Sequence, residues 1–81
     1  PSTELPLSEI EAGMDVLTLL MKTGLAASKS EGRRLVEQGG LSLNGEKVGR
    51  VDLVISEEDF SEGALILKKG KKVFHRVVIA F

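Results

Sequence analysis

Residues 25–48 have the sequence LAASKSEGRRLVEQGGLSLNGEKV, which holds the start and end signals of a helix followed by those of a hairpin. Ser28 and Glu31 have the spacing of a capping box, in which the serine oxygen accepts a backbone N–H and the glutamate reaches back to the cap. The glycine pair at positions 39 and 40 permits the left-handed backbone that ends a helix. The pattern therefore predicts a helix over residues 29–38.

A tight hairpin is predicted directly after this helix. Asn44-Gly45 tolerates the positive φ that both central residues of a two-residue turn need, and apolar residues flank it. In such a hairpin Ser42 pairs with Lys47 and Leu41 with Val48, which places Lys47 on one face and the leucines on the other. We expect the leucines to meet the apolar side of the helix.

The predicted helix has an apolar side and a basic side. At 100° per residue Leu35 and Val36 lie together, while Arg33 and Arg34 lie on the opposite arc and point outward. The polar side chains left exposed by the helix and the hairpin are rich in donors for phosphate and sugar oxygens. They are Ser28, Lys29, Ser30, Arg33, Arg34, Gln38, Asn44 and Lys47.

The upstream residues predict a second helix that pairs with the first. Residues 1–7 contain two prolines and no apolar period, so we interpret them as the end of a linker that precedes a domain over residues 8–81. Ser8 and Glu11 form another candidate capping box, and apolar residues recur at helical spacing over residues 14–23 before a glycine stop signal. A short connector would make the two helices a helix-turn-helix.

The carboxy-terminal half predicts strands. Residues 51–55 are a short apolar segment, and residues 64–69 and 72–80 are typical of two strands that turn at Gly70, the second of them central or well covered. The fold class expected is therefore α+β, with the helix-turn-helix packed on a small, mainly antiparallel sheet.

Charge is segregated along the same half of the chain. Residues 51–63 hold five acidic side chains, whereas no acidic side chain follows position 63. The basic residues of the last segment, residues 64–81, are suited to contact phosphates. They are Lys68, Lys69, Lys71, Lys72 and Arg76.

Length and composition limit the class of protein. The chain has 81 residues, a formal net charge of −1 and no cysteine, so we expect one small domain without a disulfide framework or a thiolate metal site. No apolar run approaches the ~20 residues of a membrane span and no signal-peptide pattern opens the chain, which favours a cytoplasmic protein without a membrane partner. The first residue is proline and not methionine, so we expect the chain to come from a longer one.

Catalytic chemistry is not predicted within these residues. His75 is the only histidine, cysteine and tyrosine are absent, and the carboxylates gather in one acidic segment instead of facing a base. We interpret His75 as a partly packed strand residue. The other motifs also have structural interpretations, because capping boxes stabilise helices and charged side chains solvate helix faces and loop tips. Only their combination favours nucleic-acid binding.

This combination resembles the RNA-binding domain family named after small-subunit ribosomal protein S-four, whose hallmark is a helix-turn-helix followed by a short hairpin. The matching residues are Ser28, Lys29, Ser30, Arg33, Arg34, Leu35, Val36, Gly39 or Gly40, Leu41, Leu43, Asn44 and Gly45. The segments MDVLTLLMKTGLAASKSEGRRLVEQGG and LILKKGKKVFHRV also resemble the carboxy-terminal appendage of bacterial tyrosyl-tRNA synthetases. Gly32 departs from the family, which most often has alanine there, and a helical glycine costs about 1 kcal/mol relative to alanine.

The resemblance implies an appendage that holds the long variable arm and anticodon stem of tyrosine tRNA through the exposed polar and basic residues named above. It implies no cofactor or metal in this chain, since ATP and tyrosine would bind a separate catalytic domain, which would be its protein partner. Two alternatives stay open. One is a stand-alone protein of the same fold that binds ribosomal RNA, and the other is a protein-interaction domain in which residues 73–81 dock on a partner.

Overall fold

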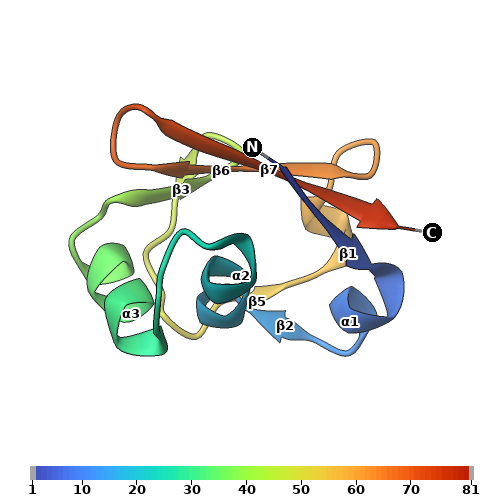
Figure 1. Ribbon diagram of the computed structural model, residues 1–81, viewed down its shortest axis with the longest axis horizontal. Helices are drawn as coiled ribbons and strands as arrows, with labels where there is room; N and C mark the ends of the chain where they lie inside the picture. The colour runs from blue at the N-terminus through green and yellow to red at the C-terminus, as the bar shows by residue number, and fades with distance from the viewer. Residues whose placement is uncertain (1, 81) are drawn as a thin grey trace.

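The computed structural model describes residues 2–80, and in it the α-helices lie on one side of a five-stranded sheet (Figure 1). In spatial order the strands of this sheet are β1 (Ser2–Pro6), β7 (Val73–Ala80), β6 (Ala64–Lys69), β3 (Leu41–Leu43) and β4 (Glu46–Lys47). A second sheet pairs β2 (Met14–Asp15) with β5 (Val54–Ile55). The helices are α1 (Leu7–Glu11), α2 (Val16–Thr23) and α3 (Lys29–Glu37), with a 3-10 turn η1 (Glu57–Asp59). The expected α+β class is confirmed.

The helix predicted from residue 29 is α3, and its start is confirmed. Ser28 Oγ accepts a hydrogen bond from the Glu31 backbone N–H at 3.2 Å, which is the serine half of the capping box. The helix ends one residue earlier than expected, at Glu37, with Gln38 as its C-cap. Gly39 follows with φ +71°, so the predicted glycine stop has the left-handed backbone expected of it.

The amino-terminal helix differs from the prediction at its start. Met14 and Asp15 form β2 instead of the first helical turn, and Asp15 caps α2 by accepting a hydrogen bond from the Thr18 N–H at 3.3 Å. The capping box expected at Ser8 is wrong, because α1 begins one residue earlier behind Pro6 and no side chain caps it. The ring of Pro6 fixes its φ at −65°, which is close to the helical value. The short helix therefore starts after Pro6 without a serine cap.

Residues 2–6 were expected to be linker, but they form β1. This edge strand pairs in parallel with β7, and its Leu5 is only 5% exposed. A five-residue strand with one buried leucine leaves no apolar period in the sequence, and its partner lies at the other end of the chain. Pro6 is the last residue of the strand, where the missing N–H is tolerated at an edge.

Both predicted hairpins are present. Ser42 pairs with Lys47, and Asn44 and Gly45 have φ values of 51° and 88°, as the two-residue turn requires. The long hairpin of β6 and β7 turns at Gly70, and β7 lies between β1 and β6, as expected of a covered strand. The apolar segment expected over residues 51–55 contributes only the two-residue β5.

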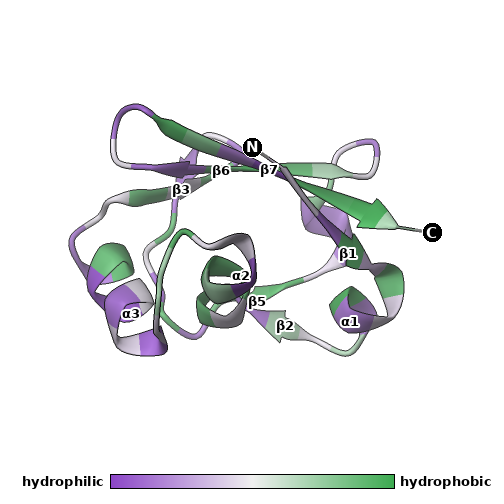
Figure 2. Ribbon diagram, viewed as in Figure 1, coloured by the Kyte–Doolittle hydropathy of each residue, from purple (hydrophilic) through white to green (hydrophobic). Residues whose placement is uncertain are grey.

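The core lies between the sheet and the helices. Leu19 and Leu20 of α2 and Leu65 and Leu67 of β6 are completely buried. Figure 2 shows the hydrophobic residues of α2 lying beneath the strands of the sheet. Because every second residue of β6 and β7 points into this core, the intervening residues point to the open face of the sheet.

Candidate nucleic-acid interface

Helix α3 packs tightly on α2 and presents its arginines outward. Gly32 is buried, and a Cβ at this position would lie 3.3 Å from side-chain carbons of Leu17 and of Leu20. The two helices therefore approach closely along the face that contains Gly32. Arg33 and Arg34 lie on the exposed side of α3, as the helical period predicted.

The glycine pair after α3 has a steric role as well as a conformational one. A Cβ at Gly39 would collide with the Lys47 side chain, so Lys47 of β4 reaches across this turn. A Cβ at Gly40 would lie 2.9 Å from Leu35 Cδ1, closer than carbon atoms approach in proteins. The pair therefore lets the chain turn sharply while Lys47 and Leu35 pack closely against the turn.

Two hydrogen bonds tie the turn of the β6–β7 hairpin to the helical pair. The Gly70 N–H donates to the carbonyl oxygen of Gly40 at 2.7 Å, and Lys69 Nζ donates to the carbonyl oxygen of Leu25 at 2.8 Å. As a result, the hairpin turn and α3 lie at the same end of the molecule (Figure 1). Lys71 and Lys72, both exposed, are thereby brought to the end that holds the arginines.

A groove of about 700 Å³ lies between these elements. Its lining includes apolar Leu25, Leu35 and Val73, and Gln38 and three lysines contribute polar groups. We name the polar and basic side chains of α3 and its two caps, together with the lysines that line this groove, the basic end. It consists of Ser28, Lys29, Ser30, Arg33, Arg34, Gln38, Lys69, Lys71 and Lys72.

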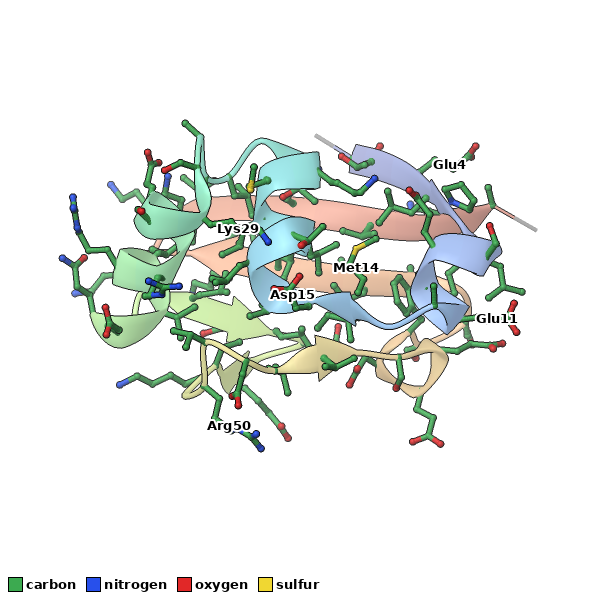
Figure 3. All side chains as sticks on the ribbon, turned by 90° about the horizontal axis from the view of Figure 1, so that it is seen from below. Glu4, Glu11, Met14, Asp15, Lys29 and Arg50 are labelled. Carbon is green, nitrogen blue, oxygen red and sulfur yellow. The ribbon has the colours of Figure 1, made fainter. Side chains whose placement is uncertain are left out.

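Most cations of the basic end have no acidic partner. Among residues 2–80 the salt bridges are Lys22 with Glu9 and Arg50 with Asp52, and neither uses α3 or the hairpin turn. Lys29 is a partial exception, because its charge acts on Asp15. The pKa of Asp15 is lowered first by its hydrogen bonds with Thr18 and then by the charge of Lys29. Figure 3 shows Lys29 next to Asp15, on the side of the molecule away from Glu11.

Asn44, expected as an RNA donor, is engaged inside the protein. Its Nδ2 donates to the Asp59 carbonyl oxygen at 2.6 Å, and its Oδ1 accepts from the Ile66 N–H at 3.0 Å. These bonds attach the hairpin turn to η1 and to β6. A direct contact between Asn44 and RNA stays a prediction.

Three basic candidates are not part of the basic end. Lys47 lies against the turn at Gly39, and Lys68 and Arg76 lie on another face of the molecule. The latter two alternate with buried residues of β6 and β7 and therefore lie on the open face of the sheet. Lys68 Nζ is 5.4 Å from the centroid of the Phe74 ring, which is a cation–π distance. The cluster of five basic residues predicted in the last segment is thus divided between two surfaces.

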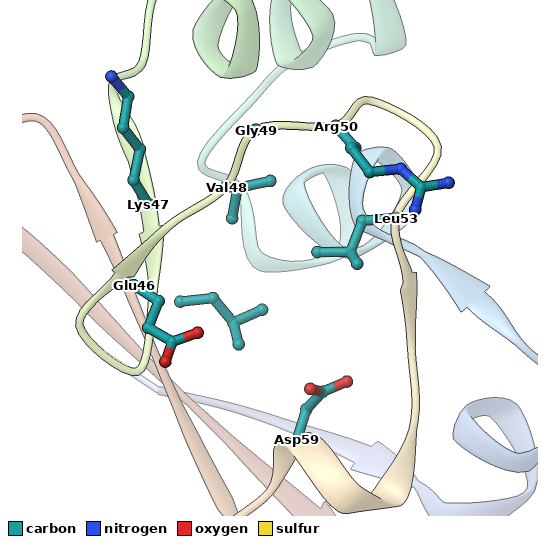
Figure 4. Close-up of a pocket in the computed structure, with 8 residues that line it drawn as sticks. Glu46, Lys47, Val48, Gly49, Arg50, Leu53 and Asp59 are labelled. Atoms are coloured by element: carbon teal, nitrogen blue, oxygen red, sulfur yellow. The ribbon is translucent and has the colours of Figure 1, made fainter.

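A smaller hollow of about 240 Å³ lies between β4 and the segment that leads to η1 (Figure 4). Glu46 and Asp59 contribute carboxylates to its lining, which makes it unsuited to a phosphate. Arg50 also lines it but pairs with Asp52 through two hydrogen bonds of 3.0 and 3.2 Å. This bonding lowers the pKa of Asp52 and raises that of Arg50. The spacing of two positions between Arg50 and Asp52 is the feature of the sequence that could have indicated this pair.

His75 faces the core, as a packed strand residue should. It is 8% exposed, and its Nε2 lies 2.6 Å from Thr3 Oγ1 of β1. Burial lowers the pKa of His75 below its usual value. Within residues 2–80 no three His, Cys, Asp or Glu side chains are grouped to hold a metal ion. In the same range no helix is both long and apolar enough to cross a membrane.

The chain is similar to the C-terminal domains of tyrosine–tRNA ligases. The profile of the family described as the tyrosine–tRNA ligase SYY-like C-terminal domain matches residues 2–77. The tyrosine–tRNA ligase of Acetivibrio thermocellus is 49% identical over 77 residues, which cover 95% of this chain and 19% of that protein. The ligase of Clostridium beijerinckii is 45% identical over 73 residues, covering 90% of this chain and 18% of that protein.

The tyrosine–tRNA ligase of Clostridium perfringens is 46% identical over 68 residues, covering 84% of this chain and 17% of that protein. This chain therefore spans less than a fifth of the length of these three relatives. The resemblance drawn from the sequence motifs is confirmed, and the chain belongs to the tyrosine–tRNA ligase SYY-like C-terminal domain family.

Proposed function

We propose that this chain is the tRNA-binding appendage of a cytoplasmic tyrosine–tRNA ligase and that the basic end is its RNA surface. In this proposal it holds the long variable arm and anticodon stem of tyrosine tRNA by phosphate and sugar contacts. ATP and tyrosine would bind the catalytic domain of the same enzyme, which is the other partner we propose. The chain would position the substrate, and the catalytic domain would carry out the reaction.

The observation that carries the proposal is the joining of two distant basic segments around one groove. The bond from Gly70 to Gly40 and the bond from Lys69 to Leu25 hold the hairpin turn at the end of the molecule where α3 lies, and Arg34 and Lys69 line one hollow there. Although the net charge of the chain is −1, the six cations of the basic end outnumber the two glutamates of α3, while residues 51–63 hold five acidic side chains elsewhere. Such segregation orients a near-neutral protein against a phosphate backbone.

The residue types of the basic end fit backbone contacts. Arg33 and Arg34 have planar guanidinium groups that bind phosphate with two parallel hydrogen bonds. Ser30 and Gln38 are exposed and carry groups suited to sugar oxygens. We expect recognition of RNA shape, because a folded RNA exposes its phosphates and 2′-hydroxyls more readily than its base edges.

The test is a titration of tyrosine tRNA with this chain at several salt concentrations, followed by fluorescence anisotropy. A second tRNA has a shortened variable arm. Each phosphate contact contributes roughly 0.7–0.9 to the log–log salt slope, so Arg33→Ala/Arg34→Ala should reduce the slope by roughly 1.4–1.8. We expect the shortened tRNA to bind more weakly than the intact one.

The matched control is Lys22→Ala/Arg50→Ala, which also removes two positive charges but from salt bridges outside the basic end. It should leave affinity and salt slope close to those of the wild type. Equal losses in both double variants would reduce the interaction to non-specific charge attraction. Equal binding of the two tRNAs would contradict the variable-arm assignment, and no binding of either would refute an RNA-binding role.

A further inference from the structure

The open face of the main sheet, which is turned away from α3, carries a second group of exposed and half-buried side chains. On β7, Phe74 and Arg76 alternate with buried residues, and Phe74 is 53% exposed. On β6, Lys68 lies opposite Phe74 and Ile66 lies opposite Arg76. We name these four residues the sheet-face patch. Figure 1 shows that the helices cover only the other face of this sheet.

The aromatic ring at the centre of the patch has basic neighbours. Lys68 Nζ lies 5.4 Å from the ring centroid, and Arg76 follows two positions along the same face of β7. Ser42 of β3 pairs with Lys68 and extends the row by one hydroxyl group. Glu4 of β1 adds an acidic side chain to this face, but its partner in the register is Val78, which lies beyond Arg76.

Charge and shape together indicate the kind of occupant. A phenylalanine exposed on a flat sheet offers a π-face on which a nucleobase can stack, whatever its identity. Lys68, which lies across from the ring on β6, and Arg76, two positions along β7, would complement the phosphates that precede and follow the base. A polyanion with planar bases fits this pattern better than an apolar protein surface, because docking an apolar surface would remove both cations from water without a partner.

We propose that the sheet-face patch is a second RNA contact, in which an unpaired base stacks on Phe74 while Lys68 and Arg76 bind the flanking phosphates. This inference rests on the proposed function, since it extends the RNA surface to a face that the basic end does not include. It adds a binding site for a nucleobase to a domain whose other proposed contacts are to the phosphates and sugars of the RNA. The RNA would then contact the domain at one end and on the open face of the sheet.

Phe74→Leu tests the proposal, because it removes the π-face and keeps an apolar side chain on an exposed strand position. The control is Val54→Ala on β5, which truncates another exposed apolar side chain at 55% exposure. Each protein is titrated with a tyrosine tRNA transcript at several salt concentrations, and far-UV circular dichroism checks that it is folded. A transcript containing 5-iodouridine is also irradiated, and the cross-linked peptide is identified by mass spectrometry.

We expect Phe74→Leu to weaken binding by roughly fivefold or more, which is the smaller end of the effect of removing one base–aromatic stack. The salt slope should stay unchanged, since no phosphate contact is lost. Val54→Ala should bind like the wild type, and the cross-link should fall on Phe74.

Wild-type affinity in Phe74→Leu, together with a weakened Arg33→Ala/Arg34→Ala variant, would overturn this inference alone and leave the sheet face to a protein partner. Failure of the wild-type chain to bind the transcript would overturn the proposed function together with this inference.

Discussion

Asn44 is a residue for which an RNA contact and an internal structural role make different predictions. Its side-chain amide bridges the Asp59 carbonyl oxygen and the Ile66 N–H, at 2.6 and 3.0 Å, while its backbone has φ 51°. Asn44→Gly removes both side-chain hydrogen bonds. Glycine adopts positive φ without strain, so the turn itself is retained. The variant therefore removes the amide without straining the turn.

The expected loss of stability follows from the two bonds. A neutral hydrogen bond contributes on the order of 0.5–1.5 kcal/mol, and we take the lower part of this range because the side chain is exposed, which gives about 1–2 kcal/mol for the pair. In a domain of this size 1 kcal/mol corresponds to roughly 4–8 °C in Tm, so the Tm of Asn44→Gly should fall by roughly 4–16 °C. Asn44→Asp retains the acceptor for Ile66 but places a carboxylate oxygen against the Asp59 carbonyl oxygen, so it should not recover the wild-type Tm.

The assay combines thermal unfolding by circular dichroism with tRNA titration at a temperature where wild type and Asn44→Gly are both folded. The internal role of Asn44 predicts a lower Tm with an unchanged affinity, whereas a direct RNA contact predicts a weaker affinity. Arg33→Ala/Arg34→Ala, whose side chains are exposed, should show an unchanged Tm and a weaker affinity. An Asn44→Gly variant that melts like the wild type and binds tRNA more weakly would refute this reasoning and make Asn44 a direct RNA contact.

Three further predictions concern stability. Ser28→Ala should lower it by about 1 kcal/mol, because the Glu31 N–H loses its acceptor, and Ser28→Asp should restore it; equal melting of both variants would contradict the cap. Because burial lowers the pKa of His75 in the folded state, the unfolded chain binds this proton more tightly, so the free energy of unfolding should fall as the pH drops below 6.5. Urea unfolding above and below pH 6.5 measures this, and His75→Gln should lose that part of the pH dependence. Leu65→Ala, at a completely buried site, should cost about 2–5 kcal/mol in urea unfolding. Ile66→Ala on the open face should cost far less, and similar costs would contradict the assigned strand faces.

The elements that were predictable from the amino-acid order are those held by local contacts. The bond from Glu31 to Ser28 spans three residues, and the turn at Asn44-Gly45 depends on the backbone freedom of the two residues themselves. Helix α3 and the β3–β4 hairpin therefore appear where the sequence predicts them. So does the outward direction of the α3 arginines, because the helical period alone sets it.

The elements that were mispredicted depend on partners far away in the chain. β1 forms because β7 offers it a parallel edge, and the hydrogen bond between Thr3 and His75 joins residues 72 positions apart. Met14 and Asp15 become a strand because β5 pairs with them, although their sequence continues the apolar period of α2. Local patterns contain no information about such partners.

The positions of the basic residues in the candidate interface likewise depend on distant partners as well as on local sequence. Arg33 and the lysines of the hairpin turn lie at one end because backbone hydrogen bonds between remote segments bring those segments together. Lys68 and Lys69 are adjacent in the sequence and look like one cluster, yet successive residues of a strand point to opposite faces. Lys69 therefore reaches Leu25 on the helical side, while Lys68 lies against Phe74 on the open face. The charges themselves are a property of the amino-acid order, but their grouping into two surfaces arises from the pleat of the sheet and its pairing with distant segments.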